Sequence, residues 1–293
     1  MSDWETLGAV DSRELTDARL QLHWAARAAA AVGIQLLPHQ PDYGEQSLQW
    51  LGRARALAQG LVQGTIARER PFRSAIRPSP AALLLLDENG AALAELPLEG
   101  HTLDAAYEWL RVEVERLLGR PLEKPLERPG EDFPAHPVGS GTPFSTAGPA
   151  FAEVGRYFAD ADRALRAVAA RHPGASPVRC WPHHFDLATL ILLDPGDNPE
   201  KACSIGVGLS PGDGDIAEPY FYVLPWPAPP TCALPTLAAG RWQTAGWMGA
   251  VLEASSFTHF TSAGPNGVQA RQVEDFLDSA VAGCRQLLEG DKP

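Results

Sequence analysis

The sequence predicts an α+β fold in which mainly antiparallel strands are covered by helices. One observation is a hairpin pattern, in which apolar runs at 81–86 and 91–98 flank the turn residues Asp87-Glu88-Asn89-Gly90. A second observation is a series of strand-like runs with no helical pattern between them: 185–193, 202–209 and 219–227. Amphipathic helical patterns stand before and after both groups. We therefore expect each half of the chain to have the order helix, strands, helix.

Composition and charge exclude several classes of partner. The 293 residues carry a formal net charge of −12, whereas nucleic acids and anionic membranes both require a basic surface, so we expect neither partner. Residues 1–8 lack a signal-peptide pattern, and no apolar run approaches the roughly 20 residues of a membrane helix. We therefore expect a cytoplasmic location and no membrane contact. The oligomeric state is left open.

The cysteines also exclude some kinds of site. They are far apart and include no Cys-x-x-Cys pair: Cys180, Cys203, Cys232 and Cys284. This spacing argues against a zinc ribbon or a redox motif and predicts free, mostly buried thiols.

The first half is predicted to begin with a helix. Asp11-Ser12-Arg13-Glu14 has the form of a capping box, and apolar residues then recur at helical spacing until Gly33, which ends the helix. Residues 46–62 fit either a helix or a strand, and we assign them to a strand because the hairpin follows. Thr102 predicts the N-cap of a second helix, which ends at Gly119.

A segment rich in proline, glycine and serine, 121–149, separates the two halves. It has little periodicity and predicts either a linker or a long wrapping loop. The division is then 1–120 for the N-terminal half and 150–293 for the C-terminal half, which opens with an amphipathic helix and closes with a helix around Phe276. The halves share their order of elements, although no residue-level repeat relates them.

The strand at 185–193 is the centre of the second half, because ionisable residues stand at the start of an apolar run. Side chains alternate across a strand, so His184 and Asp186 would share one face and lie next to each other, with His183 on the other face. A carboxylate on an apolar strand needs partners, so we expect Asp186 to be substantially buried and hydrogen-bonded. We place a candidate active site where His183, His184 and Asp186 meet His23 of the first helix.

Short motifs follow one another in the second half: Ser176-Pro177-Val178, Phe185-Asp186-Leu187-Ala188, Gly208-Leu209-Ser210-Pro211-Gly212 and Phe221-Tyr222. This pattern resembles a family of uncharacterised bacterial proteins that is catalogued as a domain of unknown function. The resemblance implies a shared fold over most of the chain, with the family's early Leu-His falling on Leu22-His23. It also implies a common site near Asp186. It implies no role for His183 and His184, where the family has small residues, and it names no reaction.

The sequence His184-Phe185-Asp186 leaves three interpretations open. The His and Asp form a structural hydrogen bond, or a metal-free acid–base pair, or two ligands of a divalent metal. In the last case His259 would complete a His-x-Asp…His site of the non-haem iron type. For either kind of enzyme, the catalytic residues would be His184, Asp186 and His23.

Further residues predict a small-molecule pocket without a nucleotide cofactor. The candidate binding residues are Trp181, His183, Tyr220 and Tyr222, although aromatic residues at period two also fit core packing. The pair Gly206-x-Gly208 lacks the glycine and helix that follow in a dinucleotide-binding loop, so no nucleotide cofactor is expected. The alternative to an enzyme is a non-catalytic ligand-binding module, in which the aromatic and glycine-rich strands form a recognition cleft.

Overall fold

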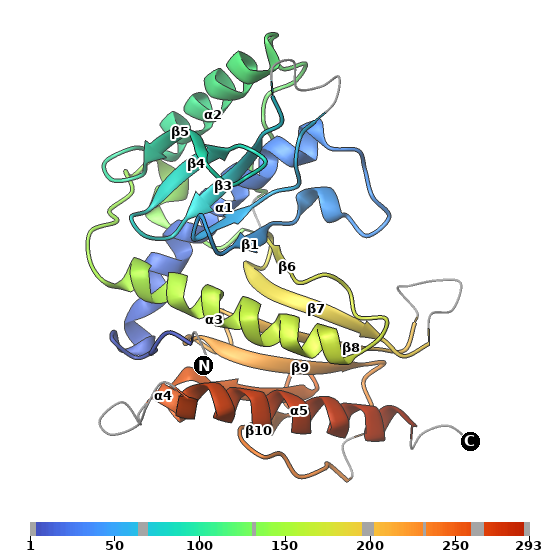
Figure 1. Ribbon diagram of the computed structural model, residues 1–293. Helices are drawn as coiled ribbons and strands as arrows, with labels where there is room; N and C mark the ends of the chain where they lie inside the picture. The colour runs from blue at the N-terminus through green and yellow to red at the C-terminus, as the bar shows by residue number, and fades with distance from the viewer. Residues whose placement is uncertain are drawn as a thin grey trace. The chain divides into compact units, whose positions relative to one another are not determined.

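The computed structural model describes residues 4–63, 70–130, 133–194, 202–230, 233–258 and 267–289. Within these ranges the chain has two antiparallel sheets, one of five strands and one of six, with helices before and after the strands (Figure 1). The predicted α+β fold class is therefore confirmed. None of the helices in these ranges is long and apolar enough to cross a membrane.

The chain forms two compact units. Unit 1 contains residues 1–13, 156–178 and 186–293, and unit 2 contains residues 14–155 and 179–185. These bounds differ from the halves drawn from the sequence. Each unit includes a short stretch from the other half, and the proline-rich segment lies inside unit 2.

Unit 2 is built on a sheet whose strands follow chain order. Its elements are α1 (Thr16–Leu36), β1 (Gln49–Leu51), β2 (Ala56–Ala58), β3 (Arg73–Arg77), β4 (Ala82–Leu86), β5 (Ala92–Pro97), α2 (Leu103–Leu118) and the short β6 (Arg179–Trp181). The five-stranded sheet has the order β1-β2-β3-β4-β5, with every neighbouring pair antiparallel. β1 and β2 lie within 46–62, so the choice of strand over helix for that stretch is confirmed.

Helix α1 differs from its prediction at both ends. A 3₁₀ turn, Ser12–Leu15, precedes the helix in place of the predicted capping box, and no side chain caps the first turn. At the other end the helix continues through Gly33 to Leu36. A Cβ at Gly33 would lie 2.2 Å from Nε2 of Gln59, so glycine serves here to let a buried side chain approach the helix rather than to end it.

The predicted hairpin and second helix are confirmed. β4 and β5 pair antiparallel, and Oδ1 of Asp87 in the turn accepts a hydrogen bond from the Asn89 amide at 2.9 Å. Oγ1 of Thr102 accepts from the Ala105 amide at 3.2 Å and so caps α2. Gly119 ends the helix in the left-handed conformation, with φ at 65°.

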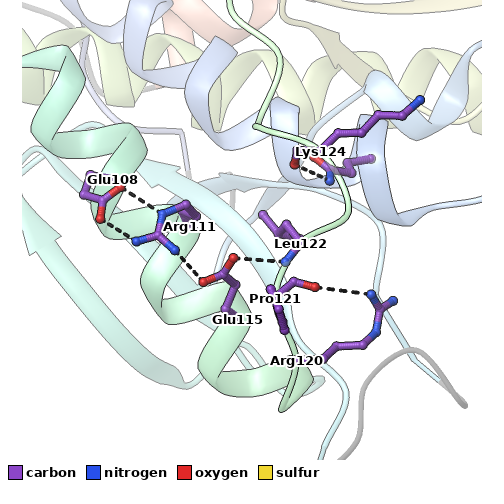
Figure 2. A network of polar contacts seen from close by, with 8 residues as sticks. Glu108, Arg111, Glu115, Arg120, Pro121, Leu122 and Lys124 are labelled. Carbon is purple, nitrogen blue, oxygen red and sulfur yellow. Dashed lines mark hydrogen bonds and ion pairs between the residues drawn. The ribbon is translucent and has the colours of Figure 1, made fainter.

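The proline-rich segment is fastened to the helices of unit 2, which favours the wrapping loop over the free linker. Figure 2 shows its first residues beside α2, where Arg111 pairs with Glu115 at 2.5 Å and Glu115 accepts from the Leu122 amide at 3.0 Å. Gln35 of α1 donates to the Lys124 carbonyl at 2.7 Å. These contacts hold the chain against both helices as it leaves α2.

Unit 1 is built on the second sheet. Its elements are residues 156–171 of α3 (Ala150–Arg171), β7 (Asp186–Leu192), β8 (Ser204–Ser210), β9 (Tyr220–Trp226), β10 (Arg241–Gln243), β11 (Gly249–Glu253), α4 (Ala254–Thr258) and α5 (Gly267–Glu289). Within unit 1 the sheet order is β10-β11-β9-β8-β7. β7, β8 and β9 are antiparallel neighbours in chain order, so the predicted meander is confirmed.

One face of this sheet packs against α5, which contacts β8, β9 and β11 (Figure 1). Phe221 of β9 is fully buried there beside Phe257, with ring centroids 6.1 Å apart. Cys284 of α5 is also fully buried, and burial raises the pKa of its thiol to about 12. Cys203 and Cys284 are free thiols, as predicted, Cys180 is buried, and Cys232 lies outside the described residues.

The central strand starts later than predicted. β7 begins at Asp186, and residues 182–185 form a turn in which Phe185 has φ at 61°. A positive φ is incompatible with an extended strand, so the alternation of side chains does not reach back to His184. The prediction that His184 and Asp186 share one strand face is therefore wrong.

Candidate functional site

The candidate residues divide between the two units. His23, Trp181, His183 and His184 belong to unit 2, whereas Asp186, Tyr220 and Tyr222 belong to unit 1. The boundary between the units falls directly after Phe185, the last residue of the turn, which has a positive φ. The candidate residues thus form two groups, one in each unit.

His23 fixes the turn that carries the other two histidines. Its side chain is buried in α1, with 4 % of the residue exposed, and Nε2 lies 2.8 Å from the Pro182 carbonyl oxygen. Because a carbonyl only accepts, Nε2 carries the proton and donates it. The His23 ring also stacks on Phe185, with centroids 5.1 Å apart and an interplanar angle of 12°. One side chain thus holds both ends of the turn at 182–185.

The environment of His23 keeps its imidazole neutral. Burial lowers the pKa of His23 to about 4, and the opposing hydrogen bond to Pro182 does not offset this effect. The charges of Arg19, His184 and His183 act in the same direction as burial. A group that stays neutral through the physiological range and whose donor is already engaged is suited to positioning the turn rather than to exchanging protons.

His183 and His184 face solvent at the tip of this turn. Their ring centroids lie 4.3 Å apart, and the ring of Trp181 lies 6.2 Å from that of His183 in an edge-on arrangement. Desolvation lowers the pKa of His183, and the charges of His184 and Arg27 add to this shift. The turn therefore presents two exposed imidazoles on a support that His23 and Phe185 hold in place.

In unit 1, Asp186 is tied to Tyr222 across the intervening strand. The Tyr222 hydroxyl donates to Oδ2 of Asp186 at 2.5 Å, from β9 to β7 across β8. The ring passes over Gly208, where a Cβ would lie only 2.4 Å from the hydroxyl. Glycine at this position is thus required for the contact. Asp186 is hydrogen-bonded as predicted, but it is partly exposed and not substantially buried.

Tyr220 makes a second pair of the same kind at the end of the sheet. Its hydroxyl donates to Oδ2 of Asp213 at 2.5 Å, in the loop between β8 and β9. Burial, followed by the hydrogen bond to Asp213, raises the pKa of Tyr220 far above its ordinary value. A buried cluster on this face of the sheet contains Tyr220, Tyr222 and Val251. The two tyrosines predicted to line a pocket are therefore largely buried against neighbouring side chains of the same sheet.

The same face of the sheet becomes open and apolar beyond the tyrosines. The register aligns Leu190, Gly206 and Leu224 in one row across β7, β8 and β9, and directly opposed residues point to the same side. Leu190 is 37 % exposed, and Trp226, which continues the tyrosine side of β9, is 54 % exposed. A Cβ at Gly206 would meet Leu224 at 3.7 Å, an ordinary contact, so there is room above the backbone at that point.

Sequence reasoning missed Leu190 and Gly206 as candidate binding residues, whereas Trp226 could be named from the sequence as one of the aromatic residues able to line a pocket. Period-two alternation alone places Leu190 on the Asp186 side of β7 and Trp226 on the Tyr222 side of β9. Alternation does not say which residues of neighbouring strands lie opposite each other. That information comes from the register of β7, β8 and β9.

The predicted metal site is not assembled among the described residues. His259 lies outside them, and within them no group of three or more His, Cys, Asp and Glu side chains is placed to hold a metal ion. His184 and Asp186 also do not share the strand face on which the prediction depended.

A groove of about 660 Å³ lies elsewhere in unit 1, along the ends of α3 and α5. Its charged side chains are paired with each other, Arg171 with Asp278 at 2.5 Å and Arg285 with Glu289 at 3.8 Å. Since each cation already has an anion beside it, the groove shows no preference for a charged ligand.

Comparisons with protein-family models, with curated proteins and with solved structures found no match for this chain. The resemblance to a family of uncharacterised bacterial proteins therefore stays a prediction.

Proposed function

We propose that the protein is a non-catalytic binding module whose ligand lies on the open face of β7, β8 and β9. The observation that carries the proposal is the exposure of Leu190 and Trp226 on the face that also holds the Tyr222–Asp186 pair. Large exposed apolar side chains that gather on one face are typical of binding surfaces. The room above Gly206, between Leu190 and Leu224, offers a place for an apolar group.

The polar end of this face suggests the chemistry of the ligand. Asp186 stands four residues along β7 from Leu190, and strands rise about 3.3 Å per residue, so the two positions lie roughly 13 Å apart on the same face. An ionised carboxylate only accepts hydrogen bonds and attracts cations. The chain's net charge of −12 acts in the same direction. A ligand with an apolar body and a cationic or donor end therefore fits this surface.

The arrangement favours binding over catalysis. Asp186 is engaged by Tyr222, and His23 is a neutral donor to Pro182, so neither is a free general base in this geometry. Stacking and apolar contact on Trp226 and Leu190 need no chemical step. The face instead resembles a preorganised platform, because the Tyr222 ring and Gly208 fix the Asp186 carboxylate before any ligand arrives.

Titration with matched pairs of small probes tests this proposal. Phenylalkylamines and phenylalkanoic acids of equal chain length share the apolar body and differ in the charge of the end. We expect the amines to bind at least roughly tenfold more tightly, a difference of about 1.4 kcal/mol. Saturation-transfer NMR detects the binding, and the amines should be recovered unchanged. Equal affinity for amines and acids, or conversion of the amine, would contradict the proposal.

Two variants locate the binding. Gly206→Val fills the room above β8 and should abolish binding without unfolding, since its Cβ makes only an ordinary contact. Val112→Ser is the matched control, because Val112 is 46 % exposed on α2 of unit 2. If both variants bind the amines as the unaltered protein does, the ligand lies elsewhere.

A further inference from the structure

Residues 4–8, called the N-terminal strap below, are docked on unit 1 by buried contacts. Trp4 and Leu7 are almost fully buried, with 3 % and 0 % of their surfaces exposed. The strap contains no helix or strand of its own. Side chains of the unit contribute to its placement.

Gln269 of α5 provides one set of contacts. Its Oε1 accepts from the Leu7 amide at 3.0 Å, and its Nε2 donates to the Leu7 carbonyl at 2.9 Å. The indole of Trp4 donates to the same Oε1 at 3.4 Å. A buried side chain amide thus pairs with the strap backbone as a neighbouring strand would, and this contact does not titrate.

Asp160 of α3 provides a further contact, and it does titrate. The residue is fully buried, and its Oδ1 accepts from the Glu5 amide at 3.1 Å and from Nη1 of Arg163 at 2.8 Å. Among the described residues, the charged groups that act on it are Arg163 on its own helix and the Glu5 carboxylate on the strap. Burial raises the pKa of Asp160 to about 7, and the Glu5 charge acts in the same direction, whereas Arg163 and the Glu5 amide oppose the shift.

We propose that the strap is a pH-sensitive latch, which is docked firmly in mild acid and opens more often as the pH rises to neutrality. In the docked state the buried Asp160 retains a proton. Once the strap opens and water reaches the carboxyl group, that proton is lost at an ordinary carboxylate pKa. Each rise of one pH unit between about 4 and 7 therefore favours the open strap by up to about tenfold.

Opening would uncover the apolar surface that Trp4 and Leu7 occupy. The charged state adds a second force in the same direction, because an ionised Asp160 repels the Glu5 carboxylate of the strap. This device is independent of the binding face on β7, β8 and β9, and it concerns only groups within unit 1.

Amide hydrogen exchange of the full chain tests the latch. The strap is followed by mass spectrometry at pH 5, 6, 7 and 8, and its rates are divided by the intrinsic rates at each pH. We expect the protection factor of the strap to fall by roughly 10- to 100-fold between pH 5 and pH 8. A protection factor that does not change with pH would overturn the proposal.

Three variants assign the effect to its cause. Asp160→Asn keeps an acceptor for the Glu5 amide but cannot titrate, so the protection factor of the strap should no longer decrease as the pH rises. Asp162→Asn is the matched control, since Asp162 is a buried acid of the same helix that pairs with Arg166, and the decrease should remain. Retention of the full pH dependence in Asp160→Asn would contradict the latch. Should Asp160→Asn not fold, Glu5→Gln serves instead. Loss of the Glu5 charge should move the decrease in the protection factor of the strap to lower pH. A decrease that stays at the same pH would overturn the proposal.

Discussion

The hydroxyl of Tyr222 donates a hydrogen bond to the carboxylate of Asp186 at 2.5 Å, and it reaches that partner by crossing the backbone of Gly208. The contact links two strands that are not neighbours in the sheet, β9 and β7. It joins an aromatic strand to the start of the central strand, and it sets the polar end of the proposed binding face.

Gly208→Ala should destabilise unit 1, because the new Cβ would lie 2.4 Å from the Tyr222 hydroxyl and 2.8 Å from the Leu187 carbonyl oxygen. Overpacking of this kind costs about 1–3 kcal/mol, which urea denaturation measures. Gly206→Ala on the same strand is the control and should change the free energy of unfolding little, since its nearest contact is 3.7 Å. Equal effects of the two substitutions would show that the Tyr222 crossing is unimportant.

Tyr222→Phe should lower the free energy of unfolding by about 1–2 kcal/mol, because the partly buried Asp186 carboxylate loses its donor. The ring and its packing remain, so the decrease in the free energy of unfolding measures the contribution of the hydroxyl group. Tyr43→Phe removes a hydroxyl from a side chain that is 54 % exposed, and it should have no effect. A stability of Tyr222→Phe equal to that of the unaltered protein would argue that water replaces the bond at no cost.

His23 should make the protein less stable in mild acid. Its pKa is about 4 in the folded state and 6.5 when unperturbed, so between these values the unfolded chain binds more protons than the native state. The free energy of unfolding should therefore fall as the pH is lowered from about 6.5 to 4, by up to about 3 kcal/mol from this group.

His23→Gln isolates that contribution. Glutamine can donate to the Pro182 carbonyl but does not titrate, so urea midpoints measured at pH 4.5 and 7.5 should differ less in the variant. His101→Gln replaces an exposed histidine of the same unit and should keep the original pH dependence. An unchanged slope in His23→Gln would mean that other groups cause the acid sensitivity.

Local patterns predicted much of the fold, because they report local physics. The Asp87 turn, the Thr102 cap and the left-handed Gly119 each depend on a few neighbouring residues, and the structure confirms all three. The prediction for Gly33 was wrong for the opposite reason. Its role depends on Gln59, whose approach to α1 is set by the tertiary fold and cannot be inferred from the helix alone.

The candidate site shows the same division. The sequence indicated that His23 would meet the segment with the histidine pair, but it could not show that the partner is the Pro182 carbonyl. An aromatic residue with a positive φ has no sequence signature, so the turn at Phe185 was missed and with it the separation of His184 from the strand. The Tyr222–Asp186 contact requires the register of three strands, which the sequence does not contain in local form.

The most direct test of the proposed binding face is a map of the residues that a bound probe perturbs. Isotope-labelled protein is titrated with the tightest-binding phenylalkylamine, and backbone and indole signals are followed by NMR. The proposed function predicts the largest chemical-shift changes at Leu190, Gly206 and the Trp226 indole. The signal of Asp186 should also shift, because the cationic amine of the probe would lie near its carboxylate. Shifts centred instead on His183 and His184, with the signals of β7, β8 and β9 unmoved, would contradict it.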